Sequence, residues 1–287
     1  MVIKFKENMI YRSIKNNLIK YFSILLFIIY IPFSSKVLLG SILIESELFF
    51  QDNLNIGERS TGVIRIRNTG EKPAKVNLYK KDYSFNSNGT NSYLEPGTLE
   101  RSNADWITIV PEKVTIPGNG RVEINYTVKV PFDKALIGSY WSLIMAEQVT
   151  NPKLNNKKNN DNVRVGVFVS TRYGIQILTN IGLTGQKKLK FTKTKIKKNV
   201  DKEYLFVDVK NVGDQFLRTK IYAEFYDQSG NYIGKFLGEE KKRIYPDTSV
   251  RFKIDISKIK NGKYSVLIVA DGEEEALFGI KYTLTIE

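Results

Sequence analysis

The sequence predicts an all-β protein built from two tandem antiparallel β-sandwiches. Runs of alternating apolar and polar residues recur along the chain, and the clearest, residues 122–128, reads VEINYTV. This alternation is the period of a strand with one buried face. Prolines and glycine-containing turns separate the runs, which is typical of a sandwich of short strands. After residue 40, no stretch shows sustained helical periodicity.

Length and composition fit this class. The chain has 287 residues, of which 42% are hydrophobic; at about 150 residues per domain, this length predicts two domains. It contains no cysteine and no histidine. Disulfides, Cys- or His-ligated zinc sites, cysteine nucleophiles and a Ser-His-Asp triad are therefore excluded. We predict no metal site, no cofactor and no catalytic residue.

The net charge of +14 is partly due to the first 40 residues. They hold six of the 44 basic and one of the 30 acidic residues, which leaves 38 against 29, or +9. The excess is mostly lysine and accompanies many Asn and Ile residues, so we interpret it as codon bias on solvated faces. The basic run at 187–198 has only Phe191 as an aromatic residue. A nucleic-acid partner, which would require arginines and aromatics gathered on one surface, is not predicted.

The first 41 residues read as a signal peptide. Residues 1–20 are basic, residues 21–33 are apolar (YFSILLFIIYIPF), and Ser34 and Ser35 follow. The apolar stretch is short for a membrane span, which needs about 20 residues. We expect export to the periplasm or the cell surface. The alternative is an uncleaved anchor through Ile44, and the membrane would then be contacted only through this segment.

The first domain, residues 42–182, contains seven predicted strands. Pro111, Pro117 and Pro131 belong at strand ends because proline cannot donate to a sheet ladder. Asn88-Gly89 favours a tight hairpin turn. Residues 147–162 are rich in Asn and Lys and predict a mobile segment. The predicted strands cover residues 44–50, 62–67, 75–83, 106–110, 122–128, 138–146 and 163–178.

The second domain, residues 183–287, follows a break near residues 180–186. Its runs are separated by the turns 211–214, 227–231 and 261–262. The predicted strands cover residues 204–210, 220–226, 250–256, 263–270 and 277–286.

Two landmarks recur in the same order in both halves. Asn68-Thr69-Gly70-Glu71 matches Asn211-Val212-Gly213-Asp214, each after a strand that ends in a basic residue. Gly138-x-Tyr140 matches Gly262-x-Tyr264, and each is followed by an apolar run. A tyrosine that enters a late strand fits the tyrosine corner of immunoglobulin-like domains. The fold predicted is therefore two tandem immunoglobulin-like β-sandwich domains behind a signal segment.

In this organisation the chain resembles the periplasmic pilus chaperones and the Gram-positive surface proteins that bind WxL-domain partners. The residues that carry the resemblance are the Trp106 strand, residues 117–131, Gly138-x-Tyr140, and residues 163–177 as the last strand of the first domain. The resemblance implies a protein partner, such as a surface or pilus subunit, bound by strand addition. The chaperone family holds a subunit's terminal carboxylate with an Arg in the first strand and a Lys in the last. Here the first strand offers Glu45 and Glu47, and the last offers arginines.

The strand at 163–177 is the predicted partner-binding site. A long alternating strand after a mobile loop can leave part of its edge unpaired, and an unpaired edge is a template for another chain's strand. The alternative is that it closes the first sandwich with its valines in the core. The candidate partner-binding residues are Val163, Arg164, Val165, Val167, Val169 and Arg172.

Other clusters favour structural roles. Asp271 with residues 273–275 could hold a glycosidase carboxylate pair, but a solvated turn is the expected reading. Asp227 to Asn231 has oxygen ligands for calcium, but also reads as a turn. Three aromatic residues could line a sugar site. Trp106 and Tyr140 are expected in the core. Trp141 follows Tyr140 in the same strand and faces the opposite side, so it is expected on the surface.

We therefore predict an exported, non-enzymatic protein-binding protein with a chaperone-like role in assembling or presenting cell-surface structures. The alternative is an adhesive module associated with the cell wall or with carbohydrate.

Overall fold

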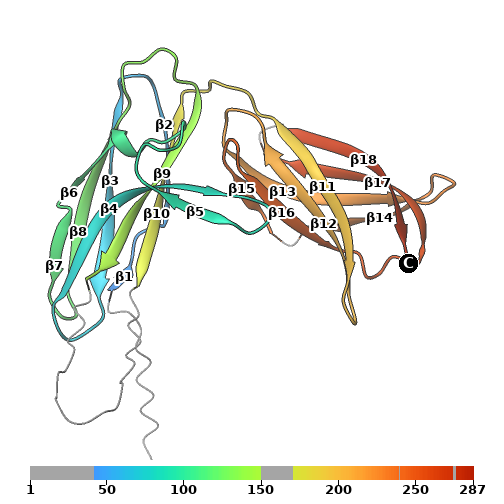
Figure 1. The fold of residues 1–287 in the computed structure, drawn as a ribbon, viewed down its shortest axis with the longest axis horizontal. Coiled ribbons are helices and arrows are strands. Elements are labelled where there is room, and N and C mark those ends of the chain that lie inside the picture. The colour runs from blue at the N-terminus through green and yellow to red at the C-terminus, as the bar shows by residue number, and fades with distance from the viewer. Residues whose placement is uncertain (1–41, 150–170, 239, 274–275) are drawn as a thin grey trace, which may run out of the picture. The chain divides into compact units, whose positions relative to one another are not determined.

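The computed structural model describes residues 42–149, 171–238, 240–273 and 276–287, and these form two β-sandwiches (Figure 1). In the first, a sheet of order β1-β3-β8-β6 faces a sheet of order β2-β10-β9-β4-β5, with β7 paired to β4. The prediction of tandem immunoglobulin-like sandwiches is confirmed. The elements are β1 (Ile42–Ile44), β2 (Phe49–Leu54), β3 (Arg59–Asn68), β4 (Ala74–Phe85), β5 (Asn91–Leu94), the 3₁₀ turn η1 (Ala104–Trp106), β6 (Ile107–Val110), β7 (Lys113–Ile116), β8 (Arg121–Lys129), β9 (Gly138–Gln148) and β10 (Arg172–Ile181).

The core of the first sandwich follows the alternation in the sequence. Ile64 and Ile66 of β3 and Ile124 and Val128 of β8 are fully buried, while their polar neighbours face outward. Each such side chain contributes about 1.5–3 kcal/mol when it leaves water. Val110-Pro111 is a cis peptide bond, and it ends β6 where the sequence predicted a stop.

The second sandwich packs a sheet of order β11-β12-β16 against a sheet of order β14-β13-β17-β18, with β15 paired to β13. Its core holds Phe225, Phe252 and Ile268, each with no exposed area. Both sandwiches lie within one unit of the chain, Gly40–Glu287. The strands are β11 (Leu189–Lys198), β12 (Glu203–Asn211), β13 (Leu217–Tyr226), β14 (Tyr232–Leu237), β15 (Lys242–Ile244), β16 (Ser249–Asp255), β17 (Gly262–Asp271) and β18 (Leu277–Ile286).

The internal repeat corresponds to two matching turns held by buried asparagines. The Asn68 amide donates to the carbonyls of Lys72, Ile116 and Pro117, and its oxygen accepts the Gly70 N–H at 2.9 Å. Asn211 repeats this with the carbonyls of Gln215 and Ile244 and the Gly213 N–H at 2.9 Å. Both asparagines are fully buried. The repeat is therefore a structural device that ties a turn to a neighbouring segment in each sandwich.

Strand β11 contains a bulge that the sequence analysis did not predict. The register with β12 runs Phe191 to Val209 and then Lys193 to Asp208, so Thr192 is the extra residue. Its hydroxyl donates to the Asp208 carbonyl at 3.2 Å. Because of the bulge, Phe191 and Ile196 both turn toward the core while the lysines between and beyond them are exposed.

The predicted first strand at 44–50 is wrong as a single element. Residues 42–44 pair with β3 in one sheet, and residues 49–54 pair in parallel with β10 in the other. The polar residues Glu45 to Glu47 are the crossing, and Glu45 pairs there with Arg121 at 2.8 Å.

The signal segment and residues 163–170 of the predicted partner strand lie outside the described residues. Within the part of the chain that is described, no helix has the length and apolar character to cross a membrane.

Candidate functional site

The first sandwich has an open strand edge at the start of β10. β9 pairs with β10 from Arg172 to Ile181, but β2 pairs with it only from Gln176 onward. The Gln176 N–H donates to the Leu48 carbonyl at 2.9 Å. Because alternate residues of a strand face the same neighbour, the N–H and C=O of Gly174 and Arg172 point to that same side. No described strand pairs with them there.

A depression of about 350 Å³ lies beside this edge on the outer face of the sheet. Tyr79, Tyr83 and Tyr93 line it together with Leu143 and Met145 of β9. Gly174 faces it, and a Cβ at that position would make ordinary van der Waals contact with Leu143 Cδ1 at 3.4 Å and the Met145 sulfur at 3.5 Å. A partner strand on the β10 edge would therefore find an apolar, aromatic surface for its outward side chains.

Arg172 is tied to the rim of this depression. Its Nε donates to a Glu147 carboxylate oxygen at 2.7 Å, and the Tyr79 hydroxyl donates to the other oxygen at 2.9 Å. The hydrogen bond with Glu147 raises the pKa of Arg172 above its ordinary value. Burial, followed by the hydrogen bond to Glu147, raises the pKa of Tyr79. Arg172 is thus already paired, and it fixes the start of β10 against the end of β9.

At the other end of the edge, an aromatic cluster joins the two sandwiches. Tyr245, 1% exposed, follows β15 and stacks on Trp141 with ring centroids 4.7 Å apart and an interplanar angle of 19°. The Tyr245 hydroxyl donates to the Gln176 side chain at 2.6 Å. The indole N–H of Trp141 donates to the Tyr83 carbonyl at 2.7 Å. Burial raises the pKa of Tyr245, so its phenol stays protonated well above neutral pH.

Polar contacts support the same junction. Arg101 pairs with Asp214 at 2.5 Å, and the Ser139 N–H donates to the Asp214 carbonyl at 2.8 Å. The Phe216 N–H donates to the Ser139 hydroxyl at 2.7 Å. Gly138 has φ of +72°, and a Cβ there would lie 2.2 Å from the Asp214 carbonyl oxygen. Glycine is therefore required at position 138, where β9 meets the Asp214 backbone.

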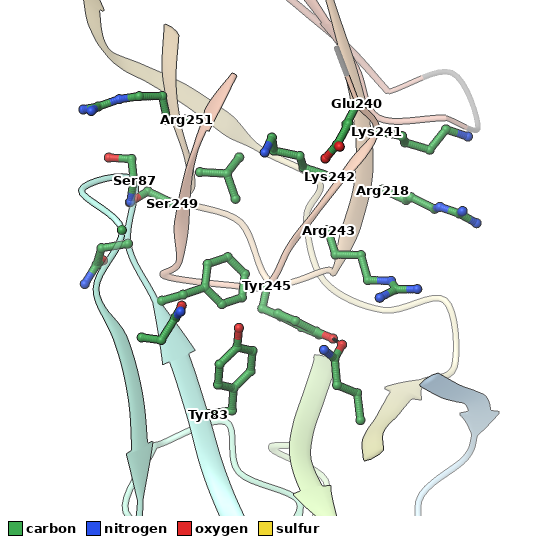
Figure 2. A pocket seen from close by; sticks show the side chains of 16 residues that line it. Tyr83, Ser87, Arg218, Glu240, Lys241, Lys242, Arg243, Tyr245, Ser249 and Arg251 are labelled. Atoms are coloured by element: carbon green, nitrogen blue, oxygen red, sulfur yellow. Dashed lines mark hydrogen bonds between the residues drawn. The ribbon is translucent and has the colours of Figure 1, made fainter. Parts of the chain in front are cut away.

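A cleft of about 700 Å³ opens above this junction, and Figure 2 shows the side chains that line it. Tyr83 points toward Tyr245 at its base (Figure 2). Arg251 at one side is neutralised by Asp208 at 2.6 Å, and Lys241 pairs with Glu273. The remaining cations have no ion pair with a described residue, and Arg243 lies 4.1 Å above the Phe49 ring. These three unneutralised cations are Arg218, Lys242 and Arg243.

The arrangement is suited to binding an anionic group. The lining carries a surplus of positive charge, aromatic faces and backbone groups, and an anionic group such as a carboxylate would be stabilised by the guanidinium forks. No group of three or more Asp and Glu residues gathers to hold a metal ion within the described part of the chain.

Of the predicted partner-binding residues, the structure places Arg172 at the open edge. Val163, Arg164, Val165, Val167 and Val169 lie outside the described residues. The prediction that Trp141 lies on the surface is wrong. Its side chain does leave the first sandwich's core, as its phase indicated, but the second sandwich covers it and it is 4% exposed. Tyr140 lies in the core, as predicted, and Trp106 is partly buried against that core. Their rings are tilted by 41°, with centroids 4.7 Å apart.

Sequence reasoning missed Tyr83, Gln176, Tyr245 and the cations of the cleft. The one available signal was the basic run Lys241-Lys242-Arg243, which one residue, Ile244, separates from a Tyr-Pro turn. The carboxylate clusters act as turns. The pKa of Asp227 is lowered by the hydrogen bond that it accepts from the Asn231 side-chain amide, and then by those from the backbone N–H groups of Asn231 and Ser229. Asp271 accepts the Glu273 N–H.

No protein-family model matches the chain, and no curated protein matches it. Among solved structures, it is similar to a chaperone–tip adhesin complex of CFA/I fimbriae biogenesis, with 16% identity, a TM-score of 0.45, and coverage of 84% of this chain and 97% of that one. It is similar to the class 5 fimbriae chaperone CfaA, with 16% identity, a TM-score of 0.44, and coverage of 86% and 100%. A third is the CsuC–CsuE chaperone–tip adhesion subunit pre-assembly complex of Acinetobacter baumannii Csu pili, with 14% identity, a TM-score of 0.42, and coverage of 84% and 98%. These structures include pilus chaperones, the family that the sequence resembles. The fold of this chain is assigned from its own strand pairing, described above.

Proposed function

We propose that this chain is an exported, non-enzymatic protein that binds an extended segment of a partner protein along the open edge of β10, in a chaperone-like role that assembles or presents cell-surface structures. The observation that carries the proposal is the pairing of β10, whose second neighbour begins only at Gln176. The N–H and C=O groups of Arg172 and Gly174 need hydrogen-bond partners, and a strand from another chain supplies them in register.

The surroundings of the edge support a protein ligand. The depression lined by three tyrosines and Met145 offers apolar contact to alternate side chains of the added strand. The cleft next to Gln176 offers unneutralised cations to an acidic group of the partner. Because Arg172 is paired with Glu147, we assign the reception of an acidic group to Arg218, Lys242 and Arg243.

Two substitutions at Gly174 test the edge. Gly174→Pro removes the outward N–H while the bonds between β10 and β9, made by its neighbours, remain. Gly174→Ala keeps the N–H and is the matched control. Capture of a partner from an envelope extract should be lost with Gly174→Pro and kept with Gly174→Ala, and the thermal melts of both should resemble the wild type. Partner capture by Gly174→Pro at the wild-type level would sink the proposal.

Val167→Asp separates the two interpretations of the preceding segment. If residues 163–169 are donated to a partner, the free protein stays folded and only capture is lost. If they close the first sandwich, an unpaired buried carboxylate costs several kcal/mol and the first domain unfolds. A melted first domain would remove the case for donation by this segment.

Export is tested by fractionation. Recovery of the full-length chain from the cytoplasm would contradict export.

A further inference from the structure

The two sandwiches differ in how their lateral sides are closed. On one side of the first sandwich, residues 45–48 cross from β1 to β2, and on the other the chain crosses from β6 to β7. In the second sandwich, the bridge between Gly238 and Ile254 links β14 to β16. On the remaining side, between β11 and β18, no described strand or bridge links the two sheets. β18 pairs only with β17 there.

The outward groups of β18 follow from its pairing. The Gly272 N–H donates to the Ala276 carbonyl at 2.8 Å at the start of the β17–β18 hairpin. In an antiparallel ladder the hydrogen-bonded pairs alternate, so the even-numbered residues of β18 face β17. The odd-numbered residues turn their N–H and C=O groups to the open side, and all of them are exposed. They are Leu277, Gly279, Lys281, Thr283 and Thr285.

The core behind this edge is incompletely covered. Phe278, Ile280, Tyr282 and Leu284 of β18 pack against the buried cluster of the second sandwich but stay partly exposed. Phe191 and Ile196 of β11 show the same partial exposure. In the first sandwich the crossing of β1 and β2 covers the corresponding residues of β10, since Ile175 and Ile177 are at most 1% exposed. An added strand would thus bury apolar area that the second sandwich leaves half open.

Positive charge also gathers on the outer face of the sheet that holds β11, where it adds to the positive potential of this side of the sandwich. β11 carries Lys190, Lys193, Lys195 and Lys197, all exposed, with no acidic residue between 187 and 200. None of these four forms an ion pair with a described residue. At one end a side chain spans the two sheets, because Lys198 Nζ donates to a Glu287 main-chain oxygen at 2.8 Å. β18 itself has one charged residue, Lys281, so a second β18 strand would bring no negative charge to this surface.

We propose that the β18 edge is a second strand-addition site, which takes an extended protein segment with apolar and acidic residues at alternate positions. The apolar residues cover Ile280, Tyr282 and Leu284, and the acidic residues face Lys281 on the outer face of the β18 sheet. Backbone hydrogen bonds to Gly279, Lys281 and Thr283 fix the register. This site uses neither β10 nor the cleft.

The test measures binding of two fluorescent ten-residue peptides to the full chain by anisotropy. One alternates valine with glutamate, and the other alternates valine with lysine. The glutamate peptide should bind, with an affinity that falls as salt rises, and the lysine peptide should not. Thr283→Pro, which removes one outward N–H, should weaken binding at least tenfold, whereas Thr283→Val should bind as the wild type does. Gly174→Pro should also bind as the wild type does, which separates this site from β10.

Hydrogen exchange on the wild-type chain gives a second measurement that is independent of how Thr283→Pro folds. The glutamate peptide should slow exchange of the Gly279, Lys281 and Thr283 amides. Equal binding of both peptides, wild-type affinity of Thr283→Pro, or protection confined to Arg172 and Gly174 would overturn the proposal. A homodimer of the free chain that Thr283→Pro abolishes would also overturn it, since a second copy would then be the occupant.

Discussion

Replacing Tyr245 with alanine should break the aromatic contact between the two sandwiches. Its ring stacks on Trp141 and lies 5.2 Å from the Phe216 ring and 5.9 Å from the Phe85 ring. Truncation of a large buried aromatic side chain costs about 3–5 kcal/mol, and the lost bond to Gln176 adds about 1 kcal/mol. We therefore expect Tyr245→Ala to lose about 4–6 kcal/mol. For a domain of this size, that loss lowers Tm by about 20 °C.

Trp141 can report on this contact directly. The chain has two tryptophans, so a Trp106→Phe background leaves Trp141 as the only one. Tyr245→Ala should expose the indole, shift its emission to longer wavelength and increase its quenching by acrylamide. Tyr245→Phe is the matched control; it keeps the ring, loses only the hydroxyl, and should cost about 1 kcal/mol with unchanged emission. If the alanine and phenylalanine variants give the same emission and the same Tm, the stack does not join the sandwiches in solution.

Three further predictions concern stability. Asn211→Ala and Asn68→Ala should each cost about 2–4 kcal/mol in urea unfolding, because buried carbonyls and a glycine N–H lose their partner; a loss below about 1 kcal/mol would contradict the role of the repeat. Burial raises the pKa of Tyr126 in the folded protein. The stability that its protonated phenol contributes is therefore present below about pH 10, and it is lost as pH rises further, by up to about 1.4 kcal/mol per pH unit. Tyr126→Phe should reduce this loss of stability at alkaline pH, and a variant whose stability depends on pH as the wild type's does would refute the prediction. Limited proteolysis should cut near Leu183, whose side chain is 93% exposed, and give two stable fragments; a chain that resists until it unfolds as a whole would count against separable domains.

The strands that the sequence predicted well are those whose alternation reflects one buried face. Residues 122–128 and 277–286 were found as β8 and β18 because each position's burial is set by its own sheet. The segment 44–50 was misread since its polar centre, Glu45 to Glu47, interrupts the alternation without a Gly, Pro, Asn or Asp to mark a turn. When a segment passes from one sheet to the other, the residues on each side of the crossing still look like strand residues. The sequence pattern therefore does not reveal that the two parts pair with different sheets.

The candidate site was harder to predict than the fold. Arg172 was identified from its place in a long alternating run, and it does begin the strand with the open edge. Tyr245, Gln176 and the cations come from separate parts of the chain and meet only through tertiary packing. Trp141 illustrates the difficulty, because its phase correctly predicted that it faces away from Tyr140. What covers that face is a residue of the other sandwich, which no local pattern encodes.

The bulge at Thr192 determines where β11 can lose one residue. The extra residue resets the alternation, so a deletion at Thr192 would restore regular pairing of Phe191 and Lys193 with β12 without moving any apolar side chain to the other face. A deletion at Ile196 would instead reverse the orientation of every residue up to the end of the strand. Shortening by one residue should therefore be tolerated at the bulge and nowhere else in β11, and relatives of this chain that lack one residue are expected to have their gap at this position.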